Sequence, residues 1–466
     1  MHALFAEHAL LPDGWARNVR LAWNPAGILT ELRVGAEAQG PLVRAVGPVL
    51  PGMPNLHSHA FQRAMVGLTE YRAPGQNDFW SWRRLMYGFA LQLGPDELEA
   101  IATQLYIEML KCGYTSVCEF HYIHRDPHGR PYLHRAELSE RLIAAAQAAG
   151  IGLTLLPVLY EFSGFGKQPP LPEQRRFIAT PEGVSDMLAE LRRTHPEHPR
   201  LRYGVAPHSL RAVSPESLGR LLEAHAVEPE VPVHIHLAEQ AAEVADSLAA
   251  LGTRPVTWLL DRFEVDARWC LVHATHMTAE ESVRVAGCRA AVGLCPSTEA
   301  NLGDGMFDAK TYLEAGGAWG IGSDSHISVS VREELRWLEH VQRLLHRKRN
   351  VLAHAGAPRV AERLFLEAVS GGAQAAGRNV AGLAVGQCAD LLVLDPDGPD
   401  GFGDDPVSAL SAWIFGNHGG HGLRDVMVGG RWVVQAGHHA REEYALRDYL
   451  RARSALLARC AAASRS

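Results

Sequence analysis

The chain has 466 residues, of which 47% are hydrophobic and 21% charged, as in ordinary globular proteins. Its formal net charge of −7 leaves no global basic field, which excludes a general attraction to nucleic acid or to anionic membranes. The seven cysteines are scattered and form no C-x-x-C pair, so neither a disulfide framework nor a cysteine zinc knuckle is expected. Residues 1–14 lack the pattern of a secretory signal, and no apolar run reaches about 18 residues, so we expect a cytoplasmic protein.

The first 47 residues are rich in β-forming residues and turns, which predicts short strands. From residue 48 onward, short β-rich runs alternate with longer helical segments. In one of these segments, residues 331–349, one face of the predicted helix carries Leu335, Leu338, Val341 and Leu345. We count eight β-rich runs, which are 49–56, 114–120, 151–159, 201–207, 231–237, 269–274, 290–296 and 318–324.

Eight alternations of strand and helix predict a TIM-like (β/α)8 barrel over residues 48–382. A doubly wound sheet is the main alternative, but it usually has a glycine-rich phosphate loop after its first strand, and none stands here. Residues 383–440 are again β-rich, and 425–437 predict a hairpin around a Gly-Gly turn. We expect a small β-sandwich domain built from 1–47 and 383–440, and a C-terminal helix over 441–466 that covers a surface.

Histidine, glutamate and aspartate recur where the predicted strands end. In a (β/α)8 barrel, the carboxyl ends of the strands form the rim that carries the active site. Side chains two residues apart on a strand point to the same side, so the first run can direct His57 and His59 at one point. The later runs end with, or are followed by, His208, His236, Glu239, His273 and Asp324. This recurrence on one rim indicates a metal-dependent active site rather than unrelated structural histidines.

Three imidazoles and one carboxylate are predicted to hold a single divalent ion. They are His57, His59, one histidine of the fifth run, and Asp324, a donor set that suits zinc first and iron or manganese as alternatives. We choose His236 over His234 because His236 lies nearer the rim. None of the four lysines stands at a strand end, so we expect no second ion bridged by a carbamylated lysine.

These residues resemble the metal and catalytic signature of the amidohydrolase superfamily, in its mononuclear deaminase branch. Longer stretches are similar to one family of that branch, whose members convert N-formimidoyl-L-glutamate and water to N-formyl-L-glutamate and ammonia in bacterial histidine degradation. The resemblance implies this deimination, a barrel beside a small β domain, and a homodimer. The stretches are PNLHSHAFQRAMVGLTE (54–70), CEFHY (118–122), APHSLRAV (206–213), HIHLAEQ (234–240) and GSDSHISVS (322–330).

Three residues have predicted roles in the reaction. We expect Asp324 to be both a metal ligand and the acceptor of a proton from the attacking water. Glu239 follows the ligand His236 by three residues and is placed to carry a proton to the leaving nitrogen, because ammonia leaves poorly unless that nitrogen is protonated. The resemblance implies that His273 holds the nucleophile and stabilises the developing charge.

The implied small-molecule substrate carries two carboxylates, which arginine binds through a planar pair of donors. The candidates from the residues alone are Arg83 or Arg84 and, just after the fourth run, Arg211. Residues 71–90, rich in aromatic side chains, follow the first run and are expected to form a lid. The substrate contacts that the resemblance implies are Gln62, Arg83, Tyr122, His208 and Arg211.

Three other functions are weighed. A mononuclear deaminase of a heterocycle such as guanine or a modified adenosine would share the barrel and the metal site, but a neutral ring calls for stacking and amide contacts instead of arginines. A barrel that kept only a scaffolding role predicts eroded ligands, whereas every ligand type is present. A metal-storage or metal-sensing protein would not need Glu239 and His273 beside its metal ligands.

Overall fold

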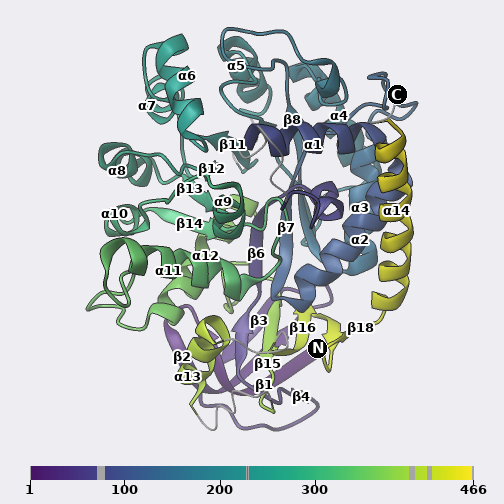
Figure 1. The fold of residues 1–466 in the computed structure, drawn as a ribbon. Coiled ribbons are helices and arrows are strands. Elements are labelled where there is room, and N and C mark those ends of the chain that lie inside the picture. The colour runs from purple at the N-terminus through teal and green to yellow at the C-terminus, as the bar shows by residue number, and fades with distance from the viewer. Residues whose placement is uncertain are drawn as a thin grey trace.

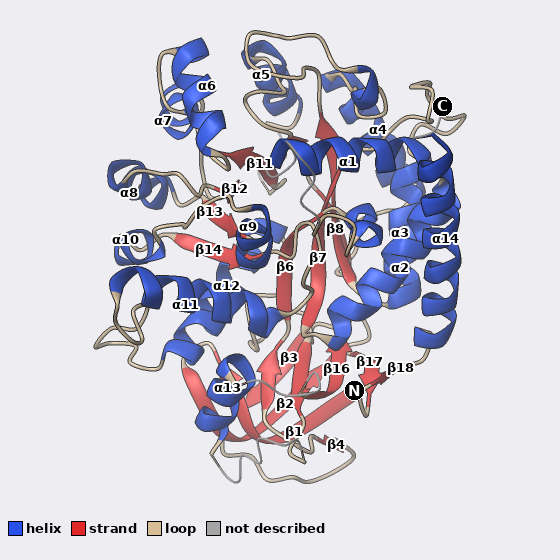
Figure 2. Ribbon diagram, viewed as in Figure 1, coloured by secondary structure: helices blue, strands red, loops and turns tan. Residues whose placement is uncertain are grey.

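The computed structural model describes residues 2–70, 79–226, 228, 230–397, 405–416 and 422–463. Strands from both ends of the chain gather in one layer at the bottom of the view, and the remaining strands stand above it among the helices (Figures 1 and 2).

Nine strands from the two chain ends pair into one sheet. Its order is β18-β17-β16-β15-β5-β1-β2-β3, with β4 paired to β1. The predicted hairpin is confirmed, since β16 and β17 pair antiparallel around Gly429 and Gly430, whose φ angles of 54° and 72° suit a tight turn with positive φ at both positions. The strands are β1 (His2–Leu11), β2 (Gly14–Trp23), β3 (Leu29–Arg33), β4 (Val43–Arg44), β5 (Val49–Pro51), β15 (Leu391–Leu394), β16 (Leu423–Val428), β17 (Arg431–Gln435) and β18 (His438–His439).

The other nine strands form two parallel sheets, β10-β8-β7-β6 with β9 on β8, and β11-β12-β13-β14. Isolated parallel bridges connect the two sheets at both sides, through Ser209 with His236 and through Ser58 with Asp324. The strands are β6 (Met53–Ser58), β7 (Tyr114–His121), β8 (Gly152–Leu159), β9 (Leu201–Tyr203), β10 (Ala206–Pro207), β11 (Val233–Leu237), β12 (Trp269–His273), β13 (Ala291–Leu294) and β14 (Ala318–Ile321). All eight predicted runs therefore contain strands.

The first predicted run differs from the structure, because the chain changes sheet at Gly52. Strand β5 pairs with β1 and β15 in the terminal sheet, whereas β6 pairs with β7. A Cβ atom at Gly52 would lie 2.2 Å from the side chain of Thr115, so only glycine fits at this crossing. The run 49–56 is thus two strands with different partners.

Helices surround the parallel strands, with α2, α3 and α14 along one side (Figure 1). In α11, Leu335 and Leu338 are buried, but Leu345 is 46% exposed, so the predicted apolar face is wrong at the last turn. The helices are η1 (Ala60–Met65), α1 (Phe79–Gln92), α2 (Pro95–Lys111), α3 (Glu137–Ala149), η2 (Pro172–Gln174), α4 (Pro181–Thr194), α5 (Pro215–Ala224), α6 (Ala241–Leu251), α7 (Pro255–Arg262), α8 (Ala279–Cys288), α9 (Pro296–Leu302), α10 (Ala309–Glu314), α11 (Val331–His346), α12 (Val360–Ala376), α13 (Pro406–Phe415) and α14 (Glu442–Ala463).

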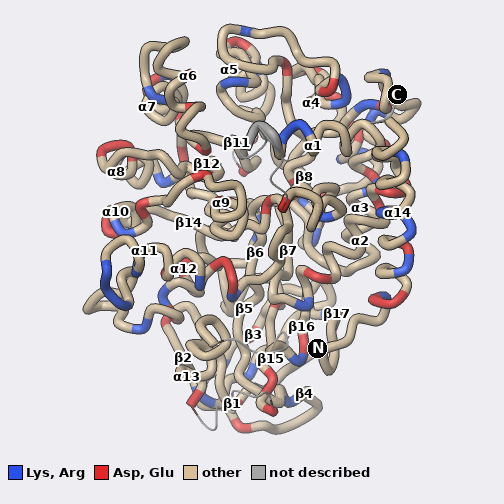
Figure 3. Tube along the Cα trace, in the orientation of Figure 1, with Lys and Arg blue, Asp and Glu red and all other residues tan. Residues whose placement is uncertain are grey.

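Basic and acidic residues are interspersed over the outer helices, as the alternating blue and red segments of α14 illustrate (Figure 3). Among the described helices, none combines the length and the apolar character needed to cross a membrane.

Candidate metal centre and active site

The end of β6 brings His57 and His59 together. Their Nε2 atoms lie 3.1 Å apart, and Nε2 of His236, from β11, lies 3.0 Å from that of His57. All three rings are at least nine-tenths buried. Burial lowers the pKa of His57 well below its usual value and that of His59 to about 3, so both rings are neutral, as metal ligands must be.

Two backbone carbonyls set the orientation of these rings. Nδ1 of His59 donates to the carbonyl of Phe120 at 2.9 Å, and Nδ1 of His236 donates to the carbonyl of His208 at 3.1 Å. A carbonyl can only accept, so the proton of each neutral ring is on Nδ1 and the lone pair is on Nε2. The unprotonated Nε2 atoms of His59 and His236 therefore both lie close to Nε2 of His57.

Asp324 completes the cluster from the loop after β14. Its Oδ1 lies 3.5 Å from Nε2 of His57 and 3.4 Å from Nε2 of His59. Main-chain hydrogen bonds fix this position, from the amide of Asp324 to the carbonyl of His57 at 3.0 Å and from the amide of His59 to the carbonyl of Asp324 at 3.2 Å. Asp324 adopts a φ of 43°, a strained conformation that such sites often use.

Two overlapping groups of described side chains could hold a divalent cation, His57 with His59 and Asp324, and His57 with His236 and His273, and the ligand atoms of each group lie within 4.8 Å of one another. In a tetrahedral zinc site with bonds of ~2.0–2.1 Å, neighbouring ligand atoms lie ~3.3 Å apart, close to the four distances given above between the Nε2 and Oδ1 atoms. His234 does not join them, because its Nε2 donates to the carbonyl of Ala375 at 2.8 Å. The choice of His236 over His234 thus agrees with where the two rings point.

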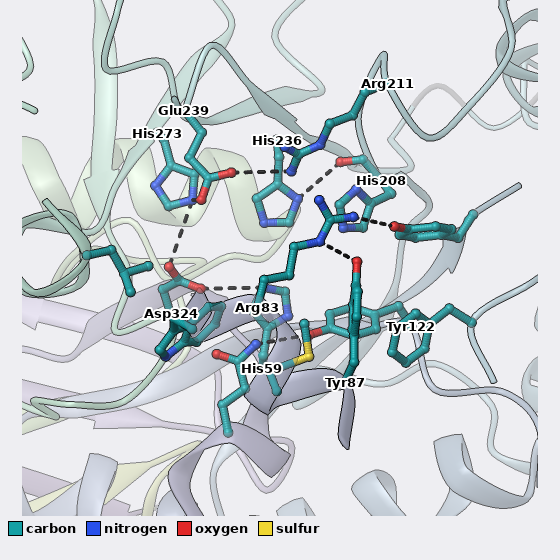
Figure 4. A pocket seen from close by; sticks show the side chains of 16 residues that line it. His59, Arg83, Tyr87, Tyr122, His208, Arg211, His236, Glu239, His273 and Asp324 are labelled. Carbon is teal, nitrogen blue, oxygen red and sulfur yellow. Dashed lines mark hydrogen bonds and ion pairs between the residues drawn. The ribbon is translucent and has the colours of Figure 1, made fainter. Parts of the chain in front are cut away.

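Glu239 and His273 stand over the donor cluster (Figure 4). Nε2 of His273 lies 3.8 Å from Oε1 of Glu239 and 3.8 Å from Oδ2 of Asp324. Burial alone lowers the pKa of His273, but the charge of Glu239 and the hydrogen bond with Glu299 are the largest of the opposing effects, which raise it to about 10. His273 is therefore a cation that can donate from Nε2 into the pocket.

Glu299, at the start of α9, is a site residue that the sequence reasoning missed. Its Oε1 accepts from Nδ1 of His273 at 3.2 Å and from the amide of Cys295 at 3.0 Å. The side chain of Glu299 is 5% exposed, and its buried carboxylate lies directly behind the ring of His273. The signal was present, because Glu299 follows the end of the seventh predicted run by three residues, the same spacing that singled out Glu239 after His236.

Glu119, at the end of β7, was also missed. Its carboxylate accepts from the hydroxyl of Ser58 at 2.6 Å, the amide of Ala60 at 2.7 Å and the hydroxyl of Tyr106 at 3.1 Å. Burial raises the pKa of Glu119 to about 7. These contacts hold the turn that carries His59. The stretch CEFHY contains Glu119, but a strand-end carboxylate that orients the main chain cannot be told from a ligand by its position alone.

The five expected substrate contacts line one pocket with three of the candidate metal donors, His59, His236 and Asp324. Arg211 is 7% exposed, and its Nη2 lies 3.5 Å from Oε2 of Glu239. Within the described part of the chain, Nε and Nη1 of Arg211 have no acceptor, so the pocket holds buried donors that suit an anion. Gln62 donates to the hydroxyl of Tyr122 at 3.0 Å.

Arg83, on α1, reaches into the same pocket, whereas Arg84 is exposed. The guanidinium of Arg83 donates to the hydroxyls of Tyr87 and Tyr160. The expected lid, 71–90, is only partly described, because residues 71–78 lie outside the described residues and the structure gives no side-chain description for 79–81. The part that is described belongs to α1.

Comparisons with known proteins agree with this geometry. The model of the amidohydrolase family matches residues 49–433, and that of the formimidoylglutamate deiminase HutF N-terminal domain matches residues 1–41. A formimidoylglutamate deiminase of Pseudomonas aeruginosa is 52% identical over 98% of this chain and 100% of its own length. An 8-oxoguanine deaminase of the same organism is 29% identical over 84% of this chain and 82% of its own length.

Among solved structures, an amidohydrolase from Brucella melitensis aligns with a TM-score of 0.92 and 45% identity, covering 98% of this chain and 100% of the other. The identity to the first relative extends over nearly all of both chains, including the N-terminal strands and the parallel sheets. The chain therefore belongs to the amidohydrolase family and, within it, to the formimidoylglutamate deiminases.

Proposed function

We propose that this enzyme hydrolyses N-formimidoyl-L-glutamate to N-formyl-L-glutamate and ammonia, a step of histidine degradation. The reaction breaks a C–N bond outside a peptide. The observation that carries the proposal is the buried guanidinium of Arg211, a residue that lines the pocket and whose Nε and Nη1 atoms have no acceptor among the described residues. A neutral purine can accept a hydrogen bond but offers no anionic partner to the buried positive charge of the guanidinium, whereas a dicarboxylate substrate supplies one.

One divalent ion, zinc, is proposed to be held by His57, His59, His236 and Asp324. When bound, zinc lowers the pKa of water and so supplies a nucleophile near neutral pH. The positions of three ring nitrogens support this assignment, because the unprotonated Nε2 atoms of His59 and His236 lie 3.1 and 3.0 Å from Nε2 of His57.

Three residues of the chain carry the proton transfers in this proposal. Oδ2 of Asp324 points away from the ligand histidines, towards His273, and accepts the proton of the attacking water. His273 donates from Nε2 to the oxygen of the nucleophile and stabilises the charge that develops on this oxygen. The attacking water gives up two protons in all, the first to Asp324 and the second from its remaining O–H as the C=O bond forms. Glu239 relays these protons in turn to the imino nitrogen, after which the C–N bond breaks and ammonia leaves.

The substrate is proposed to lie between the donor cluster and the two arginines. Arg83 and Arg211 bind carboxylates, while Gln62, Tyr122 and His208 complete the walls of the pocket. Figure 4 shows Tyr122, His208 and Arg211 on the side of the pocket opposite Asp324.

The architecture is proposed to be a closed (β/α)8 barrel over residues 48–382, with a β-sandwich domain from 1–47 and 383–440 and a terminal helix over 441–466. The two interstrand bridges support closure, because they join the sheets on both sides. A separate buried core that includes Leu4, Leu21, Leu391 and Met427 supports a terminal sheet folded over itself. We further propose a cytoplasmic homodimer, on the resemblance to the superfamily.

An ammonia-release assay tests the function. Purified enzyme loaded with Zn²⁺ is expected to release ammonia from N-formimidoyl-L-glutamate and not from guanine, and a chelator is expected to stop the reaction. Release from guanine alone would refute the deiminase assignment in favour of a heterocyclic deaminase. Full activity after verified metal removal would refute the metal assignment.

A further inference from the structure

Gln174 is a fully buried amide beside the pocket, on η2. Its Oε1 accepts from the amide of Leu171 at 2.8 Å, which fixes the orientation of the side chain. Its Nε2 therefore faces two phenols and donates to the hydroxyl oxygens of Tyr87 at 2.9 Å and of Tyr160 at 2.8 Å. Both tyrosines line the pocket and are more than nine-tenths buried.

The same two phenol oxygens also accept hydrogen bonds from Arg83. Nε of Arg83 donates to Tyr87, and Nη2 donates to Tyr160 at 3.1 Å. Arginine and the amide nitrogen of Gln174 can only donate, so each phenol oxygen uses both of its lone pairs as an acceptor. The proton of each hydroxyl must then go elsewhere.

With both lone pairs of each oxygen occupied, neither hydroxyl can accept the proton of the other. Neither O–H has another acceptor among the described residues, so both are left to donate into the pocket. A buried donor of this kind is unfavourable unless a ligand accepts from it. An acceptor-only group beside the cationic Arg83, such as a carboxylate, meets that requirement.

We propose that Tyr87 and Tyr160, aligned by Gln174, are specificity-determining residues that bind one carboxylate of the substrate together with Arg83. The inference rests on the proposed function, because it assigns a receptor to one of the two carboxylates of N-formimidoyl-L-glutamate. The receptor joins α1 to the loop that follows β8, so its two halves are far apart in sequence. Arg211, after β10, is left for the other carboxylate.

The first test replaces the phenols. The variants Tyr160→Phe and Tyr87→Phe are expected to raise KM for N-formimidoyl-L-glutamate about tenfold or more and to lower kcat much less, because a hydrogen bond to a charged group is lost. Tyr203→Phe is the matched control, since that phenol donates to the carbonyl of His195, away from the pocket. Thermal unfolding of each variant identifies any loss of folding.

The second test separates a contact with the substrate from a purely structural effect. One analogue lacks the α-carboxylate, 4-(formimidoylamino)butanoate, and the other lacks the side-chain carboxylate, N-formimidoyl-L-2-aminobutyrate. For one of the two, Tyr160→Phe and wild type are expected to have equal kcat/KM within about twofold, because the lost hydrogen bond was never made. For the other analogue the tenfold loss is expected to persist.

A third variant does not remove a phenol. Gln174→Glu keeps the shape and the contact with Leu171, but its second oxygen can only accept, so it draws the phenol protons away from the pocket. We expect a larger rise in KM than in either phenylalanine variant, with the same dependence on the analogue.

An active wild type whose variants keep the wild-type KM would overturn this inference alone, as would an equal loss on all three substrates. A wild type that releases no ammonia from N-formimidoyl-L-glutamate would overturn the proposed function and this inference with it.

Discussion

The two oxygens of Asp324 face different neighbours. Oδ1 lies beside the Nε2 atoms of His57 and His59, while Oδ2 lies 3.8 Å from Nε2 of His273. One carboxylate can therefore hold a cation with one oxygen and exchange a proton with the other. The two oxygens of Glu239 also face different neighbours, since Oε1 faces His273 and Oε2 faces Arg211.

The first prediction concerns the proton acceptor. Asp324→Asn is expected to lower kcat by roughly 100- to 10,000-fold, because an amide cannot accept the proton of the attacking water. Steady-state assays should be paired with metal analysis of the same sample. Asp261→Asn, which alters a surface ion pair with Arg284, is the control. A metal-loaded Asp324→Asn enzyme with wild-type kcat would contradict the assigned role.

The second prediction concerns the buried guanidinium. Arg211→Met is expected to raise KM for N-formimidoyl-L-glutamate by about 10- to 100-fold, because a charged hydrogen-bond donor to the carboxylate is lost. Arg220→Met, at an exposed ion pair with Glu182, should leave KM unchanged. Unaltered KM and kcat in Arg211→Met would show that this residue does not bind the substrate.

At the level of elements, the sequence predicts strand positions well and strand partners less well. All eight runs contain strands because buried parallel strands read as short apolar runs. The division at Gly52 is not visible in the run itself, because it depends on the distant Thr115. The side chains that we propose as metal ligands could be selected by their places at strand ends, whereas Glu299 and Tyr160 act through neighbours that only the folded chain supplies.

Helix α14 does more than cover a surface. Arg453 donates to the carbonyls of Ala64 and Val66, each at 2.9 Å, and Tyr449 donates to the carbonyl of Arg63 at 3.4 Å. These carbonyls belong to η1 or adjoin it, and η1 carries Gln62 into the pocket. The C-terminal helix therefore supports one wall of the active site.

The third prediction follows from this support. Arg453→Met is expected to destabilise the fold by ~1–3 kcal/mol, because two partly buried carbonyls lose their donor, and to raise KM through the displacement of Gln62. Thermal unfolding and steady-state kinetics measure the two effects. Arg451→Met, an exposed position on the same helix, should change neither. Wild-type stability in Arg453→Met would mean that water replaces the guanidinium without loss.

At the scale of the whole molecule, the first and last parallel strands are joined by a buried polar network. Nδ2 of Asn55 donates to the hydroxyl of Ser323 at 2.6 Å, and the ring of His326 contacts the hydroxyls of Ser323 at 3.0 Å and of Ser58 at 3.2 Å. These bonds lie directly beside the metal donors. The donor cluster and the junction of the two sheets are therefore one structural unit.

The fourth prediction is that the metal contributes to global stability. Chelation is expected to lower the midpoint of thermal unfolding, since an ion at 1,000 times its Kd stabilises a fold by ~4 kcal/mol. Added Zn²⁺ should restore the midpoint, and Mg²⁺ should not, because Mg²⁺ prefers oxygen ligands in octahedral geometry. An unchanged midpoint of thermal unfolding after confirmed removal of the metal would show that the cation does not contribute to the stability of the fold.

The bridge between Ser58 and Asp324 also has a consequence for biosynthesis. The ribosome releases His57 and His59 long before the segment that carries Asp324, so a nascent chain holds an incomplete ligand set throughout most of translation. Such a chain also exposes the unpaired edge of β6. Under the proposed ligand set, complete coordination of a cation must await the segment that carries Asp324, and products that terminate before this segment would lack one ligand.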